Sequence, residues 1–145
     1  LMDDIRGVVH ALRDARGLNI GTALQALAAP LPRPRLHLEI DPDVHITDAA
    51  VAEVLLRSTQ EALTNAARHG DAGTVHLRLS QDESGLHLRI HDDAPATRAS
   101  APLREGNGLT GMRERVAALG GSIGITRSGG GLRIEATLPH SGAPA

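Results

Sequence analysis

The sequence predicts an α+β fold, in which a mixed, mostly antiparallel sheet packs on helices as a two-layer sandwich. Apolar residues alternate along five short segments, and four of these segments form two adjacent pairs, as in β-hairpins. Segments with helical spacing lie beside these pairs. This order favours helices gathered beside an antiparallel sheet over a parallel sheet with alternating helices.

The composition supports one compact domain and excludes several classes of function. The chain has 145 residues and is 41% hydrophobic, but it has no Phe, Tyr or Trp, so its core must be aliphatic. Its net charge is −2 and it shows no basic stripe, which argues against nucleic-acid binding. Without cysteine there is no disulfide framework or thiolate metal site.

Targeting signals are absent from the sequence. No apolar run reaches the roughly 18 residues of a membrane span, and there is no secretory signal pattern, so we expect a cytoplasmic location. The chain starts at Leu1-Met2 in the middle of a pattern. We interpret it as a fragment of a longer protein, whether that parent is free or anchored in a membrane.

The first part of the chain predicts two short helices and a strand. Residues 1–16 are amphipathic and form a short helix or the end of a longer one. Residues 21–29 predict a second helix that Pro30 stops, and residues 30–35 are an extended connector because their prolines are incompatible with a helix interior. Residues 36–40 alternate as a strand.

Residues 48–69 form the longest helical pattern, which Asp48 or Thr47 can cap and Gly70 can end. At 100° per residue, apolar side chains fill one arc, to which Ala67 belongs. The opposite arc is polar and contains Glu53, Arg57, Gln60, Glu61, Asn65 and Arg68.

The second half of the chain predicts two hairpins with a helix between them. Residues 74–80 and 85–91 both alternate and are separated by QDES, which predicts a hairpin. Residues 109–119 carry a helical apolar stripe. Residues 122–127 and 132–138 are two further strands, joined by a glycine-rich turn.

Residues 106–111, GNGLTG, match the pattern G-x-G-x-x-G but do not fit a dinucleotide site. No strand precedes them and no acid follows at about 20 residues, as that site requires. The absence of lysine also excludes a Walker A loop. Three glycines lead into a helix start, whose free N–H groups favour an anion. The alternative is a helix start that binds nothing.

A polar stripe on the long helix is a second candidate site. Glu61, Asn65 and Arg68 lie at i, i+4 and i+7, with His69 at the edge of the stripe. An amide oxygen suits Mg²⁺ and a guanidinium suits phosphate oxygens, so the stripe is able to hold a metal–phosphate group. The alternative is a solvated helix face with contacts among these side chains.

Acids and histidines at the second strand pair offer weaker candidates. Asp92-Asp93 ends a strand, where a carboxylate can accept a hydrogen bond from an exocyclic amine such as that of adenine; an ordinary turn acid is the alternative. His87 and His91 share a strand face. Arg89 lies between them and makes a metal site there poor.

The order of these motifs is specific. QEALTNAARHG at 60–70, a strand ending in Asp92-Asp93, GNGLTGMRERVAALGG at 106–121 and GGGLRIEATLP at 129–139 resemble the ATP-binding catalytic domain of bacterial histidine kinases. The branch that pairs with NarL-type response regulators is most similar. IRGVVHALRD at 5–14 looks like the segment that joins its dimerisation helices to the ATP domain.

The resemblance implies a domain division and a fold. Residues 1–16 would be the end of a dimerisation helix and a linker, 17–139 the ATP-binding domain and 140–145 a loose tail. The fold would be the Bergerat type, a two-layer α/β sandwich shared with gyrase and Hsp90.

The resemblance also implies roles for the site residues, with ATP and Mg²⁺ as the cofactors. Asn65 would hold Mg²⁺ between the phosphates, with Arg68 and His69 near the phosphate chain. Glu61 would support the site or activate the attacking group, and Asp92 would receive the adenine amine. Residues 94–105 would form the ATP lid. The nucleotide-binding segment at its far end would contain Gly106, Gly108, Leu109 and Gly111.

The implied reaction is transfer of the γ-phosphoryl group to a histidine, mostly by positioning and charge neutralisation. The family's acceptor lies in a dimerisation helix and is followed by an acid. His10 is followed by Ala11, and His91 precedes Asp92 but lies on a strand. We therefore expect the acceptor upstream of residue 1, in a parent that is a homodimer. The expected partners are that dimerisation domain and a NarL-type response regulator, with no nucleic acid.

One motif departs from the family. Its first glycine box reads D-x-G-x-G, whereas this chain has Asp92-Asp93-Ala94-Pro95-Ala96. If the backbone needs a positive φ at either alanine, each costs about 1 kcal/mol, so we hypothesise weak Mg-ATP binding or an altered lid. Leu132 also stands where relatives often have a small polar residue.

Two alternatives to the kinase reading follow. A degenerate domain that serves as an interaction module would explain the two alanines. A related serine kinase that acts on a small regulatory protein is the other, but the linker-like residues 1–16 argue against it.

Overall fold

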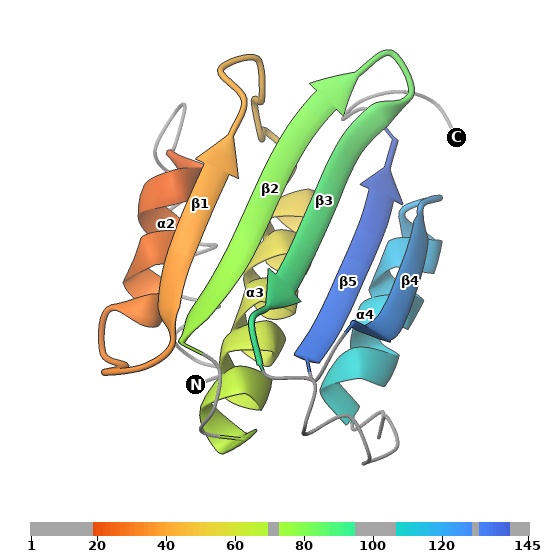
Figure 1. Cartoon of the computed structure of the whole chain (residues 1–145). Coiled ribbons are helices and arrows are strands. Elements are labelled where there is room, and N and C mark those ends of the chain that lie inside the picture. Colours follow the sequence, from red (N-terminus) through yellow and green to blue (C-terminus); the bar gives the residue numbers. More distant parts are fainter. Residues whose placement is uncertain (1–18, 70–72, 95–106, 129–130, 140–145) are drawn as a thin grey trace.

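The computed structural model describes residues 19–69, 73–94, 107–128 and 131–139, with the backbone alone at positions 68, 69, 107, 108, 127 and 128. The helix expected within 1–16, most of the expected lid and the expected tail therefore lie outside the described residues. Within them, one five-stranded sheet carries all the described helices on a single face (Figure 1). None of these helices is long and apolar enough to cross a membrane.

The element order confirms the predicted two-layer α+β architecture. The strands lie in the order β1-β2-β3-β5-β4. β1 and β2 pair in parallel because α3 crosses over between them, and the other neighbouring pairs are antiparallel. The elements are α2 (Ile20–Ala28), β1 (Arg35–Ile40), α3 (Ala49–His69), β2 (Thr74–Asp82), β3 (Gly85–Asp92), α4 (Asn107–Ala118), β4 (Ser122–Ser128) and β5 (Gly131–Leu138).

The ends of the helices follow from single residues. At the start of α3, the carboxylate of Asp48 accepts the backbone N–H of Ala50 at 2.8 Å, so this acid is the cap rather than the preceding threonine. α4 ends in a Schellman motif: Gly120 has φ +78°, and the N–H of Gly121 donates to the carbonyl of Val116 at 2.9 Å. Glycine is needed at position 120 because other residues rarely adopt that φ.

The core lies between the sheet and the helices and is wholly aliphatic apart from Met112. Alternate residues of β2, β3 and β5 point into it, as the period of two requires. The fully buried large side chains are Leu24, Leu55, Leu56, Leu63, Leu77, Leu79, Ile90, Met112, Ile134, Leu138, Val54 and Val75.

The predicted polar arc of α3 is partly buried in the middle of the helix. Arg57 is only 8% exposed, and Ser58 and Thr59 are fully buried, whereas Ala67, which we placed on the apolar arc, is exposed. α2 and α4 both pack against α3 and cover its sides. Helical period alone does not reveal such lateral neighbours, so it overestimated the exposed part of this helix.

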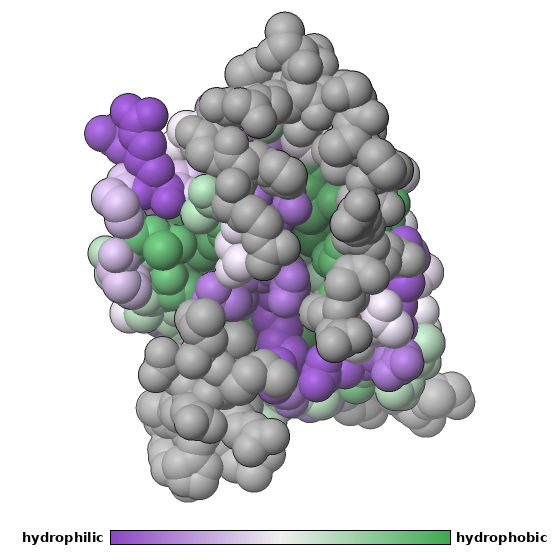
Figure 2. Space-filling model, turned by 90° about the horizontal axis from the view of Figure 1, so that it is seen from below, coloured by the Kyte–Doolittle hydropathy of each residue, from purple (hydrophilic) through white to green (hydrophobic). Residues whose placement is uncertain are grey.

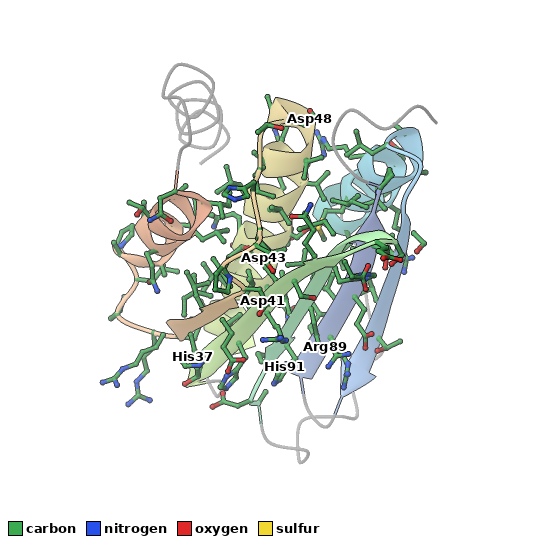
Figure 3. All side chains as sticks on the ribbon, turned by 90° about the horizontal axis from the view of Figure 1, so that it is seen from above. His37, Asp41, Asp43, Asp48, Arg89 and His91 are labelled. Carbon is green, nitrogen blue, oxygen red and sulfur yellow. The ribbon has the colours of Figure 1, made fainter. Side chains whose placement is uncertain are left out.

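None of the described helices lies on the other face of the sheet (Figure 1), which carries rows of polar side chains. His37, His76 and His91 are paired across three strands, and Arg133 is next in the row. The ring centroids of His76 and His91 are 4.9 Å apart and stacked, and those of His37 and His76 are 5.5 Å apart. Figure 3 shows His37, His91 and Arg89 on this face, away from the helices. Within the described ranges, no group of three or more His, Asp or Glu is arranged to hold a metal ion.

Burial and the neighbouring charges make protonation of His91 unfavourable. Burial is the largest cause that lowers the pKa of His91, followed by the charges of His76 on β2 and Arg133 on β5; Arg89 adds to this and Asp92 opposes it. A histidine with a lowered folded pKa takes up its proton more readily in the unfolded chain. The stability that neutral His91 contributes is therefore present above the unfolded pKa and is lost as the pH falls.

We predict that acid destabilises the wild-type domain more than a His91→Gln variant. The free energy of unfolding should fall between about pH 7.5 and about pH 5.5, and it should fall less in the variant. Urea unfolding at both pH values measures this difference. His45→Gln, which removes an exposed histidine outside the row, should behave as the wild type. An equal loss in wild type and His91→Gln would contradict the prediction.

Candidate functional site

The predicted site residues converge at one end of the molecule. α3 and β3 end there, while α4, β2 and β5 begin there (Figure 1). Figure 2 looks directly onto this end, where hydrophilic surface lies next to hydrophobic surface between the segments drawn in grey. Residues from distant parts of the chain thus meet here; Asp92 and Leu132, which are hydrogen-bonded, are 40 positions apart in the sequence.

Asp92 is the central acid of this end. It continues the inward series Leu86, Leu88 and Ile90 of β3 and is only 7% exposed, so its carboxylate enters the helix side of the sheet. One carboxylate oxygen accepts the backbone N–H of Leu132 at 3.1 Å. The other accepts the N–H of its near neighbour, Ala94, at 3.0 Å.

These two hydrogen bonds fix the orientation of the carboxylate but leave it able to accept further hydrogen bonds. A carboxylate has about four lone-pair positions, and the two amides occupy one on each oxygen. The group is therefore able to accept a further hydrogen bond from a ligand, as expected for recognition of an exocyclic amine. The alternative reading of Asp92 as an ordinary turn acid does not fit its burial.

Asp93 has a different task. It points to the opposite side, is exposed, and its carboxylate accepts the N–H groups of Gly73 at 2.8 Å and Thr74 at 3.0 Å. It thereby ties the start of β2 to the end of β3. Alternation along β3 thus distinguishes the two adjacent acids: Asp92 faces the site, and Asp93 serves the sheet.

Gly131 is a site residue that the sequence analysis missed. A methyl group at this position would overlap the Asp92 carboxylate, so only glycine leaves room for that acid. The sequence contains a signal for this, since three glycines stand directly before the strand at 129–131. We interpreted them only as a turn and as part of a family motif.

The polar stripe of α3 reaches this end. Glu61 and Asn65 are half-buried and lie one turn apart in the last three turns of the helix. Neither side chain has a hydrogen bond or ion pair with the described residues, so the contact expected for a merely solvated face is not present between them. Arg68 and His69 are the next polar residues and lie in the final turn of α3.

The glycine segment forms the start of α4. Gly108, Leu109 and Gly111 all lie within the helix, and Gly106 is outside the described residues. Leu109 is 7% exposed and its side chain belongs to the core, so we expect any contact with a ligand to come from its backbone. Gly111 does not have a positive φ.

Comparison with known proteins places the chain in a family. Residues 50–142 match the model of the histidine kinase-, DNA gyrase B- and HSP90-like ATPase. The chain belongs to this family of ATPase domains, which confirms the fold and the resemblance inferred from the motifs.

Similar proteins include sensor histidine kinases. The sensor histidine kinase YxjM of Bacillus subtilis is 35% identical over 95% of this chain. UhpB of Salmonella typhimurium, a signal transduction histidine-protein kinase/phosphatase, is 32% identical over the same share. The chain spans only 34% and 28% of these two proteins. The match therefore concerns about a third of each of these proteins.

Solved structures agree on the fold. The histidine kinase domain of a blue-light activated histidine kinase from Erythrobacter litoralis has a TM-score of 0.63 at 24% identity, covering 83% of this chain and 58% of that one. The histidine kinase AdeS of Acinetobacter baumannii has a TM-score of 0.61 at 16% identity, covering 96% and 76%.

We predict that Gly131→Ala destabilises the domain by about 2 kcal/mol, because the new methyl group displaces a buried carboxylate from its amide partner. Chemical denaturation measures the change. Gly124→Ala is the matched control: it is also a glycine in a strand, but nothing lies within 4 Å of the added carbon. A loss no larger in Gly131→Ala than in Gly124→Ala would contradict the assigned role of Gly131.

Proposed function

We propose that this chain binds Mg-ATP at the end described above and donates the γ-phosphoryl group to a histidine of the parent protein's dimerisation domain. One observation supports this proposal most: a buried carboxylate, Asp92, is held by two backbone amides and keeps capacity for a ligand's amine. Each of its oxygens accepts one backbone amide, so lone pairs remain for a ligand at this end of the sheet.

The residues present suit the adenine of ATP. Asp92 accepts the exocyclic amine, and its place is kept by Gly131 and by the N–H of Leu132. The surrounding core is aliphatic, so aliphatic side chains rather than aromatic rings sandwich the base. Leu132 itself is buried and contributes its backbone N–H to the acid, so its replacement of a small polar residue leaves this contact in place.

The residues of α3 suit the phosphates and Mg²⁺. The side-chain oxygen of Asn65 is a suitable ligand for a hard cation and has no partner among the described residues. Glu61, one turn earlier, orients or deprotonates the attacking group. Arg68 and His69 neutralise phosphate charge. The start of α4 presents its backbone N–H groups to the same anion.

The wider assignments follow the same proposal. Residues 17–139 constitute the ATP-binding domain, 1–16 the link to the dimerisation domain and 140–145 a loose tail. The phosphorylated histidine passes its group to a response regulator, and the motifs of residues 60–70 and 106–121 favour a regulator of the NarL type.

Substitution of the two central residues tests the nucleotide site. We expect Asn65→Ala and Asp92→Asn each to weaken Mg-ATP binding at least tenfold, about 1.4 kcal/mol or more. The first removes a metal ligand, and the second replaces an acceptor with an amide that can present a donor to the base. Isothermal titration calorimetry measures both. Asp43→Asn, at an exposed acid between β1 and α3, is the control and should bind as the wild type.

Two results would count against the proposal in different ways. Wild-type affinity in both site variants would refute the assigned residues. No binding of Mg-ATP or ADP by the wild type at millimolar concentration would favour a degenerate domain that acts as an interaction module.

The two alanines of the altered glycine box have separate expectations. Ala94 does not have a positive φ, so the backbone strain that we considered at this position is absent; Ala96 lies outside the described residues. We therefore expect Ala94→Gly alone to change Mg-ATP affinity less than twofold. Ala96→Gly should raise it by up to about tenfold if a methyl group at that position crowds the lid. Calorimetry on both single variants and the double variant separates these effects. Unchanged affinity in the double variant would show that neither alanine limits binding.

A further inference from the structure

A cluster of three charged side chains joins α3 to α4. The carboxylate of Glu53 accepts the Nε–H of Arg57 at 2.8 Å, and the Nε of Arg115 lies 3.7 Å from the same oxygen. Glu53 and Arg57 are on α3, and Arg115 is in the last turn of α4. Glu53 thus lies between two guanidinium groups, one from each helix.

Arg57 makes this cluster more than an ordinary surface pair. Its side chain is only 10% exposed, whereas those of Glu53 and Arg115 are 34% and 39% exposed. A buried cation requires a fixed counter-charge, because an uncompensated charge inside a protein is strongly unfavourable. Arg57 therefore holds the Glu53 carboxylate in place, and the carboxylate in turn offers a fixed point to Arg115.

Gly111 leaves space for the third member. A Cβ atom at this position would lie 3.0 Å from a terminal guanidinium nitrogen of Arg115, which extends back over the preceding turn of α4. Glycine is otherwise unfavourable inside a helix, and Gly111 does not have the positive φ that would demand it. An alanine at this position would therefore require the tip of the Arg115 side chain to move by a few tenths of an ångström.

The consequence concerns the placement of α4. Leu109, Met112 and Val116 are buried and hold this helix against the core along one side. The ion pair between the Nε of Arg115 and the Glu53 carboxylate, 3.7 Å apart, joins α4 to α3 at one place along their length. It sets how α4 lies along α3, and therefore where the start of α4 stands relative to Asn65.

We propose that Glu53, Arg57 and Arg115 are positioning residues, which fix where the start of α4 lies relative to the phosphates. Gly111 leaves the space that the Arg115 guanidinium occupies, which we call the seat of Arg115, and does not itself contact the nucleotide. The effect on ligand binding rests on the proposed function. The coupling of Gly111 to Arg115 does not, because it is a property of the protein alone.

A double-mutant cycle tests the proposal on nucleotide binding. Gly111→Ala and Arg115→Met should each raise the dissociation constant of Mg-ATP roughly three- to tenfold, and the double variant should be no weaker than Arg115→Met. Glu53→Gln should match Arg115→Met. Gly124→Ala, at a glycine with open space around it, is the control and should bind normally. If Gly111→Ala weakens binding by the same factor with and without Arg115, the seat is refuted.

Adenosine distinguishes positioning from general damage. It contains the base but not the phosphates, so these variants should bind it as the wild type does in an NMR titration while they bind Mg-ATP more weakly. Equal weakening of adenosine and Mg-ATP would overturn the positioning role.

Thermal unfolding without nucleotide tests the coupling between Gly111 and Arg115 independently of the proposed function. In the Arg115→Met background, Gly111→Ala should raise the midpoint by about 3 °C, because alanine favours a helix and nothing opposes it. In the wild-type background the rise should be absent or reversed. Equal shifts would refute the seat. Unequal shifts in a chain that binds no nucleotide would support the seat and reject the proposed function.

Discussion

The site depends on one buried charge that the backbone holds. Asp92 lies at the end of an inward-facing strand series, and the N–H groups of Ala94 and Leu132 replace the water that its carboxylate loses on folding. Gly131 makes that arrangement possible because any side chain there would occupy the space of the acid. The hydrogen bonds of this one carboxylate thus fix the position of Leu132, at the start of β5, and of Ala94 relative to the end of β3.

A second constraint is that all the helices in the described part of the chain pack on one face of the sheet (Figure 1). Because of that asymmetry, successive side chains along each strand have different roles. Those on one side belong to the core or face the ligand, and those on the other side form solvated rows of charge. It separates Asp92 from Asp93 even though the two are adjacent. It also places the stacked rings of His76 and His91 on the face opposite the core.

The sequence was sufficient to predict the helices and strands, which follow from local patterns of residues. It was insufficient to predict features that result from contacts between elements distant in the sequence. Alternation and capping predicted every described strand and helix, and the order of motifs predicted the family. The burial of Arg57 was not predictable from helical period, because it results from α2 and α4 flanking α3. Likewise, the roles of Gly131 and Gly111 depend on side chains that approach from other strands or turns, so composition alone suggested only flexible turns and a phosphate contact.

The aliphatic core described above also makes the domain optically silent. A chain without Phe, Tyr or Trp has no intrinsic fluorescence and almost no absorbance in the near ultraviolet. A purine that binds beside Asp92 would therefore be the only strong chromophore of the complex, and its spectrum would report its surroundings without interference. A single tryptophan introduced on the exposed sheet face would, in the same way, be a lone emitter whose signal comes from one known position.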